Sequence, residues 1–226
     1  MSKEEDYNAL VQSRKSCHLC LGLTNPAVCG NGDFDSDHMG PWTRWQGNLN
    51  AKLMIIGQDW GDLAYFLNNE GVESPKNPTN HNLMRLLASI GVNIDPLPKF
   101  SEFEGQVFLT NAILCLKQGG LQGAVRQEWF DSCGTKHLKP NIELVRPEVL
   151  ISLGSMAYEV LQKLYDLPSV PFRDAVNSQS GIILSSGTQY FPMYHCGSRI
   201  INTHRKFAQQ IEDWARVKSC FTATET

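Results

Sequence analysis

The sequence predicts an α/β fold in which a short, mainly parallel sheet carries helices on both faces. Four short apolar runs have the length of buried strands, and segments with helical periodicity lie between and after them. Neither internal repeats nor Gly/Ser-rich linkers divide the 226 residues. Strands that are apolar on both faces and separated by helices are typical of a parallel sheet covered on each side.

The four predicted strands are runs of four or five residues that are almost wholly apolar. They are residues 53–56, 107–110, 149–153 and, with the weakest pattern, 190–194. Runs of this length, bounded by polar or Gly-containing stretches, favour strands over helices. We therefore expect a four-stranded sheet.

Four segments repeat apolar residues every three or four positions, which predicts amphipathic helices. They are residues 82–90, 127–144, 155–165 and 201–217. We expect one domain over residues 1–226, with flexible ends at 1–16 and 219–226.

Composition points to a globular protein outside the membrane. Hydrophobic residues make up 42% of the chain and charged residues 19%, and the mean hydropathy is −0.27. No run approaches the roughly 18 apolar residues of a membrane span, and the acidic stretch 1–6 lacks the apolar core of a secretory signal. We expect a cytoplasmic, monomeric protein that does not bind membranes.

The net charge of −3 gives no overall sign of nucleic-acid binding. The densest basic stretch is near the end of the sequence, where residues 199–218 contain five Lys and Arg side chains. This stretch could contact phosphates, or it could be a solvated helix face.

Polar and Gly-containing segments follow all four predicted strands. The segments are Gly57–Asp62, Asn111, Gly154–Ser155 and His195–Ser198. In open α/β sheets the ligand binds beyond the carboxyl ends of the strands. The sequence therefore predicts one composite site at that edge of the sheet.

Seven cysteines are present, and a reducing compartment disfavours disulfides between them. Cys17 and Cys20 form the one close pair, while Cys115 and Cys133 follow the second predicted strand. Such a set can bind zinc or an iron–sulfur cluster, or it can consist of buried thiols.

Taken in order, these motifs resemble the uracil-DNA glycosylase superfamily, in particular its iron–sulfur branch, family 4. The resemblance covers residues 17–218 and rests on the cysteine pair, the glycine loop 57–61, the segment 110–115, Cys133, the stretch 147–154 and the His-led loop 195–198. It implies a three-layer α/β/α sandwich around a short, mainly parallel four-stranded sheet. It also implies an enzyme that hydrolyses the N-glycosidic bond of uracil, or of a related deaminated base, flipped out of DNA.

The resemblance implies a role for several side chains at the strand ends. His195 would donate a hydrogen bond to uracil O2, Asn111 would read the base, and backbone N–H groups of the loop from Gly57 would add donors. The Gln-Asp pair of this loop is similar to Gly-Gln-Asp-Pro-Tyr of family 1, so Asp59 would orient the attacking water and Gln58 would contact the substrate. Asp59 could instead cap the following helix, with Asp62 as the alternative cap or base.

The aromatic residue that stacks on the base in relatives has no counterpart at 71–73. Trp60, Tyr65 and Phe66 are the substitutes, although Tyr65 and Phe66 could equally belong to the core. This departure leaves open a glycosylase for another damaged base, or a catalytically silent nucleic-acid-binding module.

The last loop of the family enters the DNA. Here Ser198 and Arg199 would contact phosphate, and Ile200 or Ile201 would wedge into the base stack or be buried in the core.

The resemblance further implies a structural [4Fe–4S] cluster bound by four cysteines, with zinc as the alternative metal. They are Cys17, Cys20, Cys115 and Cys133. No role follows for Cys29, Cys196 and Cys220.

Overall fold

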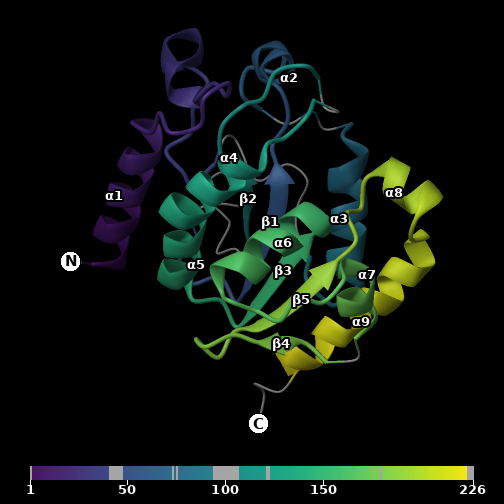
Figure 1. Cartoon of the computed structure of the whole chain (residues 1–226). Helices are drawn as coiled ribbons and strands as arrows, with labels where there is room; N and C mark the ends of the chain where they lie inside the picture. Colours follow the sequence, from purple (N-terminus) through teal and green to yellow (C-terminus); the bar gives the residue numbers. More distant parts are fainter. Residues whose placement is uncertain are drawn as a thin grey trace.

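A computed structural model describes most of the chain around one central sheet. The described residues are 2–40, 48–72, 74, 76–93, 107–120, 123–178 and 180–222. The sheet has five strands in the order β2-β1-β3-β5-β4 (Figure 1). Their bounds are β1 Leu53–Asp59, β2 Val107–Ile113, β3 Val149–Leu153, β4 Ile182–Ile183 and β5 Gln189–Met193.

The prediction of a mainly parallel sheet is confirmed, but the number of strands is corrected from four to five. Strands β2, β1, β3 and β5 pair in parallel, and β4 pairs with β5 in the antiparallel direction. Strand β4 has two residues, Ile182 and Ile183, and its apolar run ends at Leu184, so it is shorter than the four residues that predicted the other strands.

Helices occupy most of the remaining described chain. They are α1 Lys3–Lys15, α2 Leu63–Asn68, α3 Pro78–Ser89, α4 Gln127–Cys133, α5 Lys139–Val145, α6 Ser155–Leu164, α7 Phe172–Asn177, α8 Ser198–Thr203 and α9 Phe207–Thr222. A 3₁₀ segment, η1, covers Pro26–Gly32, and a π-helical turn, η2, covers Gly134–Leu138 and joins α4 to α5. None of the described helices has the length and apolar content needed to cross a bilayer.

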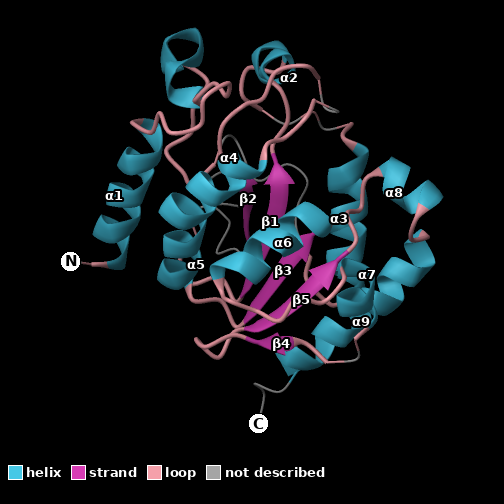
Figure 2. Cartoon of the chain, in the orientation of Figure 1, coloured by secondary structure: helices cyan, strands magenta, loops and turns pink. Residues whose placement is uncertain are grey.

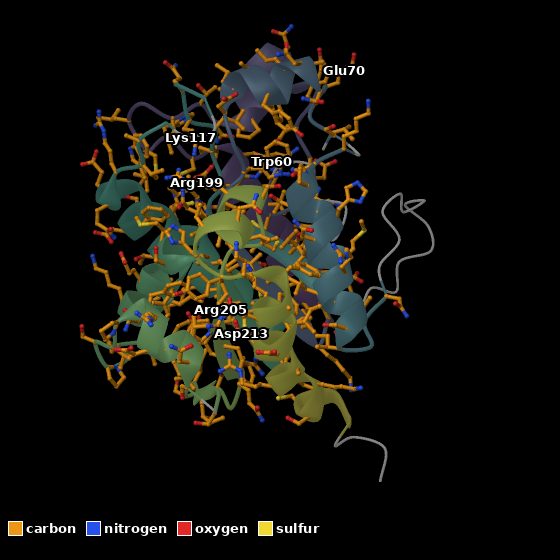
Figure 3. The ribbon with its side chains drawn as sticks, turned by 90° about the vertical axis from the view of Figure 1, so that its right-hand side faces the viewer. Trp60, Glu70, Lys117, Arg199, Arg205 and Asp213 are labelled. Carbon is orange, nitrogen blue, oxygen red and sulfur yellow. The ribbon has the colours of Figure 1, made fainter. Side chains whose placement is uncertain are left out.

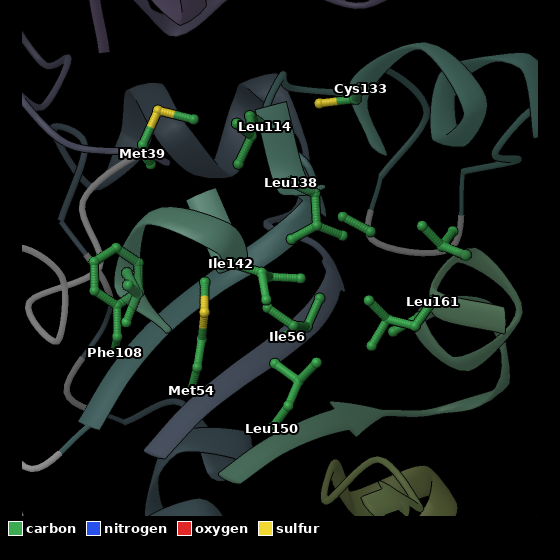
Figure 4. Packing of buried hydrophobic residues seen from close by; sticks show 14 of the residues in the cluster. Met39, Met54, Ile56, Phe108, Leu114, Cys133, Leu138, Ile142, Leu150 and Leu161 are labelled. Atoms are coloured by element: carbon green, nitrogen blue, oxygen red, sulfur yellow. The ribbon is translucent and has the colours of Figure 1, made fainter. Parts of the chain in front are cut away.

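The three-layer arrangement is confirmed, and it follows from the alternation of side chains along each strand. Met54, Ile56 and Leu150 pack against the helices on one face, including Ile142 of α5 and Leu161 of α6 (Figure 4). On the opposite face the intervening strand residues pack against α3 and α9. Helices on both sides of the strands are visible in Figure 2. Both faces of the sheet are therefore closed to ligands, and its carboxyl edge is left for a site.

The predicted helix 201–217 is interrupted, because residues 204–206 separate α8 from α9. The turn is held by Arg205, whose guanidinium binds the Asp213 carboxylate at 2.6 and 2.9 Å. Gln210 Nε2 also donates to the Arg205 carbonyl at 3.2 Å. The Arg205–Asp213 ion pair does not alter the spacing of apolar residues, so this spacing predicted one continuous helix.

Residues 3–15 form helix α1, which corrects the expectation of a flexible end over 1–16. A capping box between Ser2 and Glu5 starts the helix. Tyr7 and Val11 are buried in the core, where Tyr7 meets Phe108 of β2 edge-on at 6.2 Å between ring centroids. At the other end, α9 extends to residue 222, and residues 223–226 lie outside the described part of the chain.

The packing of α1 predicts a large difference between two neighbouring substitutions. Tyr7→Ala removes a buried ring whose hydroxyl accepts the Met39 N–H at 3.1 Å, so it should lower the free energy of unfolding by about 3 kcal/mol. Asn8→Ala changes an exposed side chain and should stay within about 0.5 kcal/mol of wild type. Urea unfolding measures both, and equal effects would contradict the docking of α1.

Candidate active site

The carboxyl ends of β1 and β2 bring Asp59 and Asn111 to one edge of the sheet. Gly57 and Asn111 are direct partners in the parallel register. Leu53 and Ile55 face α3 and α9, so the alternation of the strand places Gly57 and Asp59 on the same side. Val107 of β2 packs in the same apolar cluster as Leu53 and Ile55. Asn111 follows Val107 by four positions, so its side chain lies on the same face of the sheet. These polar groups therefore share one face of the sheet at its carboxyl edge.

Gly57 allows the Asn111 side chain to lie across β1. A Cβ atom at position 57 would stand 2.2 Å from Asn111 Oδ1, a distance that no side chain can tolerate. The Asn111 side chain is largely buried, yet its amide forms no hydrogen bond to any described residue. The amide is therefore available to a ligand.

Asp59 is held by a buried lysine that the sequence analysis did not single out. Lys117 Nζ lies 3.0 Å from Asp59 Oδ1 and 3.1 Å from Oδ2, and Gln58 Nε2 donates to Oδ2 at 2.5 Å. The Asp59 and Lys117 side chains are only 7% and 6% exposed. The signal available in the sequence was the place of Lys117 just after a predicted strand, beside Cys115.

The backbone around Lys117 is joined to the first loop. The Lys117 N–H donates to the Gly61 carbonyl at 3.3 Å, and the Leu63 N–H donates to the Lys117 carbonyl at 3.0 Å. Asp62 caps α2, because its Oδ1 accepts the Tyr65 N–H at 2.7 Å. The helix-capping role that Asp59 could have filled therefore belongs to Asp62. Lys117 and Trp60 both lie in the upper part of Figure 3, away from the Arg205–Asp213 pair.

His195 follows β5, and its surroundings define its tautomer. The Gly197 N–H donates to Nδ1 at 3.0 Å, so the neutral ring carries its proton on Nε2. Burial lowers the pKa of His195, and the negative charge of Asp59 acts in the opposite direction. Gly154 lies beside His195 and adopts a φ of +92°. A Cβ atom built on Gly154 would stand 3.6 Å from the Cβ atom of His195, which is van der Waals distance. The site thus pairs a carboxylate with a neutral imidazole that can donate a hydrogen bond.

The three aromatic candidates divide into one fully buried residue and two partly buried ones. Phe66 is completely buried in a cluster with Cys29 and Leu116, so it belongs to the core and cannot contact a base. Trp60 and Tyr65 are partly exposed and lie 5.5 Å apart between ring centroids, tilted by 40°. Tyr65 is anchored through its hydroxyl, which accepts the Ser74 N–H at 3.1 Å.

The stretch that carries the stacking aromatic in relatives has no ring among its described residues, Gly71 and Val72, and residue 73 lies outside them. The final loop leads into α8, where Ser198 and Arg199 are exposed and Ile200 and Ile201 are half-buried.

A separate cavity of about 340 Å³ is lined by the four cysteines of the predicted metal site, Cys17, Cys20, Cys115 and Cys133, and by Arg14 and His137. The cysteines come from three segments of the chain, which follow α1, follow β2 and end α4. No three His, Cys, Asp or Glu side chains of the described residues stand close enough together to hold a metal ion. The four thiols therefore line one cavity but are not drawn together around the position of a single ion.

Burial favours the neutral forms of two cysteines and of His137 in this cavity. Burial raises the pKa of Cys115 to about 12 and raises that of Cys133 well above its ordinary value. Burial also lowers the pKa of His137 to about 4. A set of four thiols is the donor set that iron–sulfur clusters and tetrahedral zinc use, and binding either one would release protons.

The remaining cysteines lie elsewhere. Cys29 packs beside Phe66, the Cys196 thiol donates to the Thr79 carbonyl at 3.4 Å, and Cys220 donates to Gln189 Oε1 at 2.9 Å. None of them lines the thiol cavity.

The fold and the site define an α/β protein with a charged ligand site at the carboxyl edge of its sheet and a thiol-lined cavity beside it. The family model of the Uracil DNA glycosylase superfamily matches residues 45–218, and the chain belongs to this superfamily. A protein named type-5 uracil-DNA glycosylase, from Pyrobaculum aerophilum, is 23% identical over 180 residues, which are 78% of this chain and 73% of that protein. The resemblance drawn from the sequence motifs is therefore confirmed at the level of the superfamily.

The buried ion pair predicts a non-additive pattern of stability. Lys117→Met leaves the Asp59 carboxylate buried without its cation and should lower the free energy of unfolding by about 3 kcal/mol or more. The double variant Lys117→Met/Asp59→Asn removes both charges and should cost clearly less than the sum of the two single changes.

Lys76→Met is the matched control, because Lys76 is exposed. Urea unfolding of the four proteins against wild type measures these effects. A Lys117→Met variant as stable as Lys76→Met would contradict the ion pair.

Proposed function

We propose that this protein is a DNA glycosylase that hydrolyses the N-glycosidic bond of uracil, or of a related deaminated base, after the base has been flipped out of DNA. The observations that carry the proposal are the adjacent ends of β1 and β2, which bear Asp59 and Asn111, and the electrostatic interaction of Asp59 with His195, together with membership of the superfamily. A base cannot be reached inside a duplex, so such an enzyme needs a pocket at an open edge of its fold.

Asn111 is the group proposed to read the base. Its amide oxygen can accept the N3–H of uracil while its NH₂ group donates to O4. Cytosine presents the opposite pattern, with an acceptor at N3 and a donor at C4. The absence of a side chain at Gly57 keeps the space around Oδ1 open for this pairing.

His195 and Asp59 are proposed to stabilise the two charges that develop as the bond breaks. The Nε2–H of neutral His195 donates to uracil O2 as the departing base becomes an anion. The Asp59 carboxylate orients the attacking water and offsets the positive charge of the oxocarbenium-like sugar. Lys117 and Gln58 are positioning residues that hold the carboxylate, which has about four acceptor sites and so retains room for a water molecule.

The proposed DNA contacts surround this centre. Ser198 and Arg199 are exposed at the start of α8, where they can contact phosphate, and the half-buried Ile200 and Ile201 follow as candidate wedges. The Trp60–Tyr65 pair is proposed to contact the flipped nucleotide. Trp60 follows Asp59 directly, which supports this placement.

We further propose that Cys17, Cys20, Cys115 and Cys133 hold a [4Fe–4S] cluster, with zinc as the alternative. The shared cavity supports this, because four thiols from three segments of the chain line it. When bound, the group would supply a covalent cross-link between the segment after α1 and the segments around β2 and α4. The cysteines would thereby fix the N-terminal segment to the loop that carries Lys117.

A second candidate function is a glycosylase of the same fold for another damaged base. Two observations favour it: Trp60 stands where relatives have Pro, and no ring is present at Gly71 or Val72. Hypoxanthine, xanthine, mismatched thymine and 5-substituted uracils, offered beside uracil, would separate the two candidates.

The function is tested by incubating the purified full chain with single- and double-stranded oligonucleotides that contain one uracil. We expect release of the base, with Asp59→Asn and His195→Ala each lowering the rate by about 100-fold or more. Asp174→Asn is the matched control, because Asp174 is exposed on α7, and it should retain wild-type activity. Binding of DNA without release of any base in the panel would contradict the proposal and indicate a silent binding module.

The environment of His195 predicts the acid side of the pH profile. Burial lowers its pKa below the ordinary value of 6.5, so the neutral donor persists to more acidic pH. We expect kcat/KM to be level from about pH 8 to about 6.5 and to decline only below that range, as the ring gains a proton. The residual activity of His195→Ala should lack this step. A wild-type rate that rises as the pH falls through 6.5 would show that the charged ring is the active form.

A further inference from the structure

His137 is a buried polar side chain that lacks partners within the described part of the chain. It is 2% exposed, and neither Nδ1 nor Nε2 has a hydrogen-bond partner there. Buried polar atoms are almost always hydrogen-bonded, and an orphan in a native fold indicates a missing partner. His137 lines the thiol cavity, so the partner is to be sought in that cavity.

The local backbone places this ring against the cysteines. Cys133 is the last residue of α4, and His137 follows it by four positions within the π-helical turn η2. Turns of this kind are rare and occur frequently at functional sites. Gly134 allows the turn to lie close to α6, since a Cβ at that position would stand 3.3 Å from Val160 Cγ1. The turn thus brings a cysteine and a histidine one turn apart to the same cavity wall.

Arg14 contributes a second unpartnered donor to the same wall. Its side chain is 1% exposed and binds Asp35 Oδ1 at 2.6 Å and the carbonyls of Ser36 and His38 at 2.6 and 2.9 Å. Its Nε has no partner within the described residues. The cavity is therefore lined by thiols and by N–H donors that have no acceptor in the described part of the chain.

We infer that His137 donates an N–H hydrogen bond to a sulfur atom of the cluster held by the four cysteines, and so sets its reduction potential. The inference rests on the proposed [4Fe–4S] site. Hydrogen bonds to the sulfurs are among the factors that set the potential of such clusters. A donor stabilises the more negative, reduced state, so His137 raises the potential. The Arg14 guanidinium, a fixed positive charge on the same wall, acts in the same direction.

The test begins with the metal content of the full-length chain purified without oxygen. About four irons and four sulfides per chain, with absorbance near 400 nm, are expected (roughly the behaviour of cysteine-ligated clusters). A chain that holds only zinc, or no metal, overturns the cluster proposal and this inference with it. The glycosylase proposal is judged separately by the oligonucleotide assay.

With iron present, redox titration of wild type is compared with His137→Phe and His137→Gln. We expect His137→Phe to lower the ratio of reduced to oxidised cluster about tenfold at a given potential. For one electron this equals a fall of about 59 mV in the reduction potential. His137→Gln retains an N–H donor and should stay near wild type. The matched control is His204→Phe, since His204 is exposed and does not line the cavity, and it should leave the potential unchanged.

An iron-loaded His137→Phe with the wild-type potential overturns the inference. If His137→Phe does not load iron, His137→Gln is the deciding variant. A loaded cluster near the wild-type potential in His137→Gln supports the hydrogen bond. Loss of iron in both variants overturns the inference and indicates that His137 is a ligand or is needed for folding. If the cluster resists reduction, its Fe–S vibrations in H₂O and D₂O replace the titration. The deuterium shift should be smaller in His137→Phe than in wild type, and an equal shift overturns the inference.

Discussion

The parallel register of β1 between β2 and β3 is the constraint on which the rest of the structure depends. It places Gly57 opposite Asn111 and aligns the strand ends at one edge. The apolar residues of these strands are buried on both faces by helices, so the register cannot slip without exposing the core. The polar groups at position 59 and beyond are therefore held where the helices no longer cover the sheet. A rigid scaffold with an open edge is what a site that must surround an extruded base requires.

A three-residue segment connects the two parts of the proposed machinery. Cys115 lines the thiol cavity, and Lys117 holds the Asp59 carboxylate. Between them, Leu116 exchanges both backbone hydrogen bonds with Thr24, at 2.8 and 2.9 Å. A group bound by the cysteines would thus restrain the same backbone that positions Lys117. The thiol cavity and the proposed active site thus differ in chemistry but are connected through neighbouring residues of the chain.

The prediction from sequence was most accurate for elements that are determined by the local spacing of apolar residues. The cores of the four longer strands and the continuous helical stretch over residues 127–145 follow from runs and spacings of apolar residues. Helix α1 was missed because its buried face is narrow, with Tyr7 and Val11 among mostly polar neighbours. The break after α8 was missed because it depends on the Arg205–Asp213 clamp, which does not alter the apolar pattern.

The sequence by itself determined the superfamily, the layered α/β architecture and the positions of Asp59, Asn111 and His195 at strand ends. These follow from neighbouring residues and from the order of motifs, which are properties of the chain before it folds. Only the tertiary structure decided that Lys117 pairs with Asp59, that Phe66 is buried in the core, and that His137 lines the thiol cavity with no hydrogen-bond partner among the described residues. Asp59 and Lys117 are separated by 58 positions. Contacts of this range arise from packing, since the burial of a charge or a ring depends on which distant segments close around it.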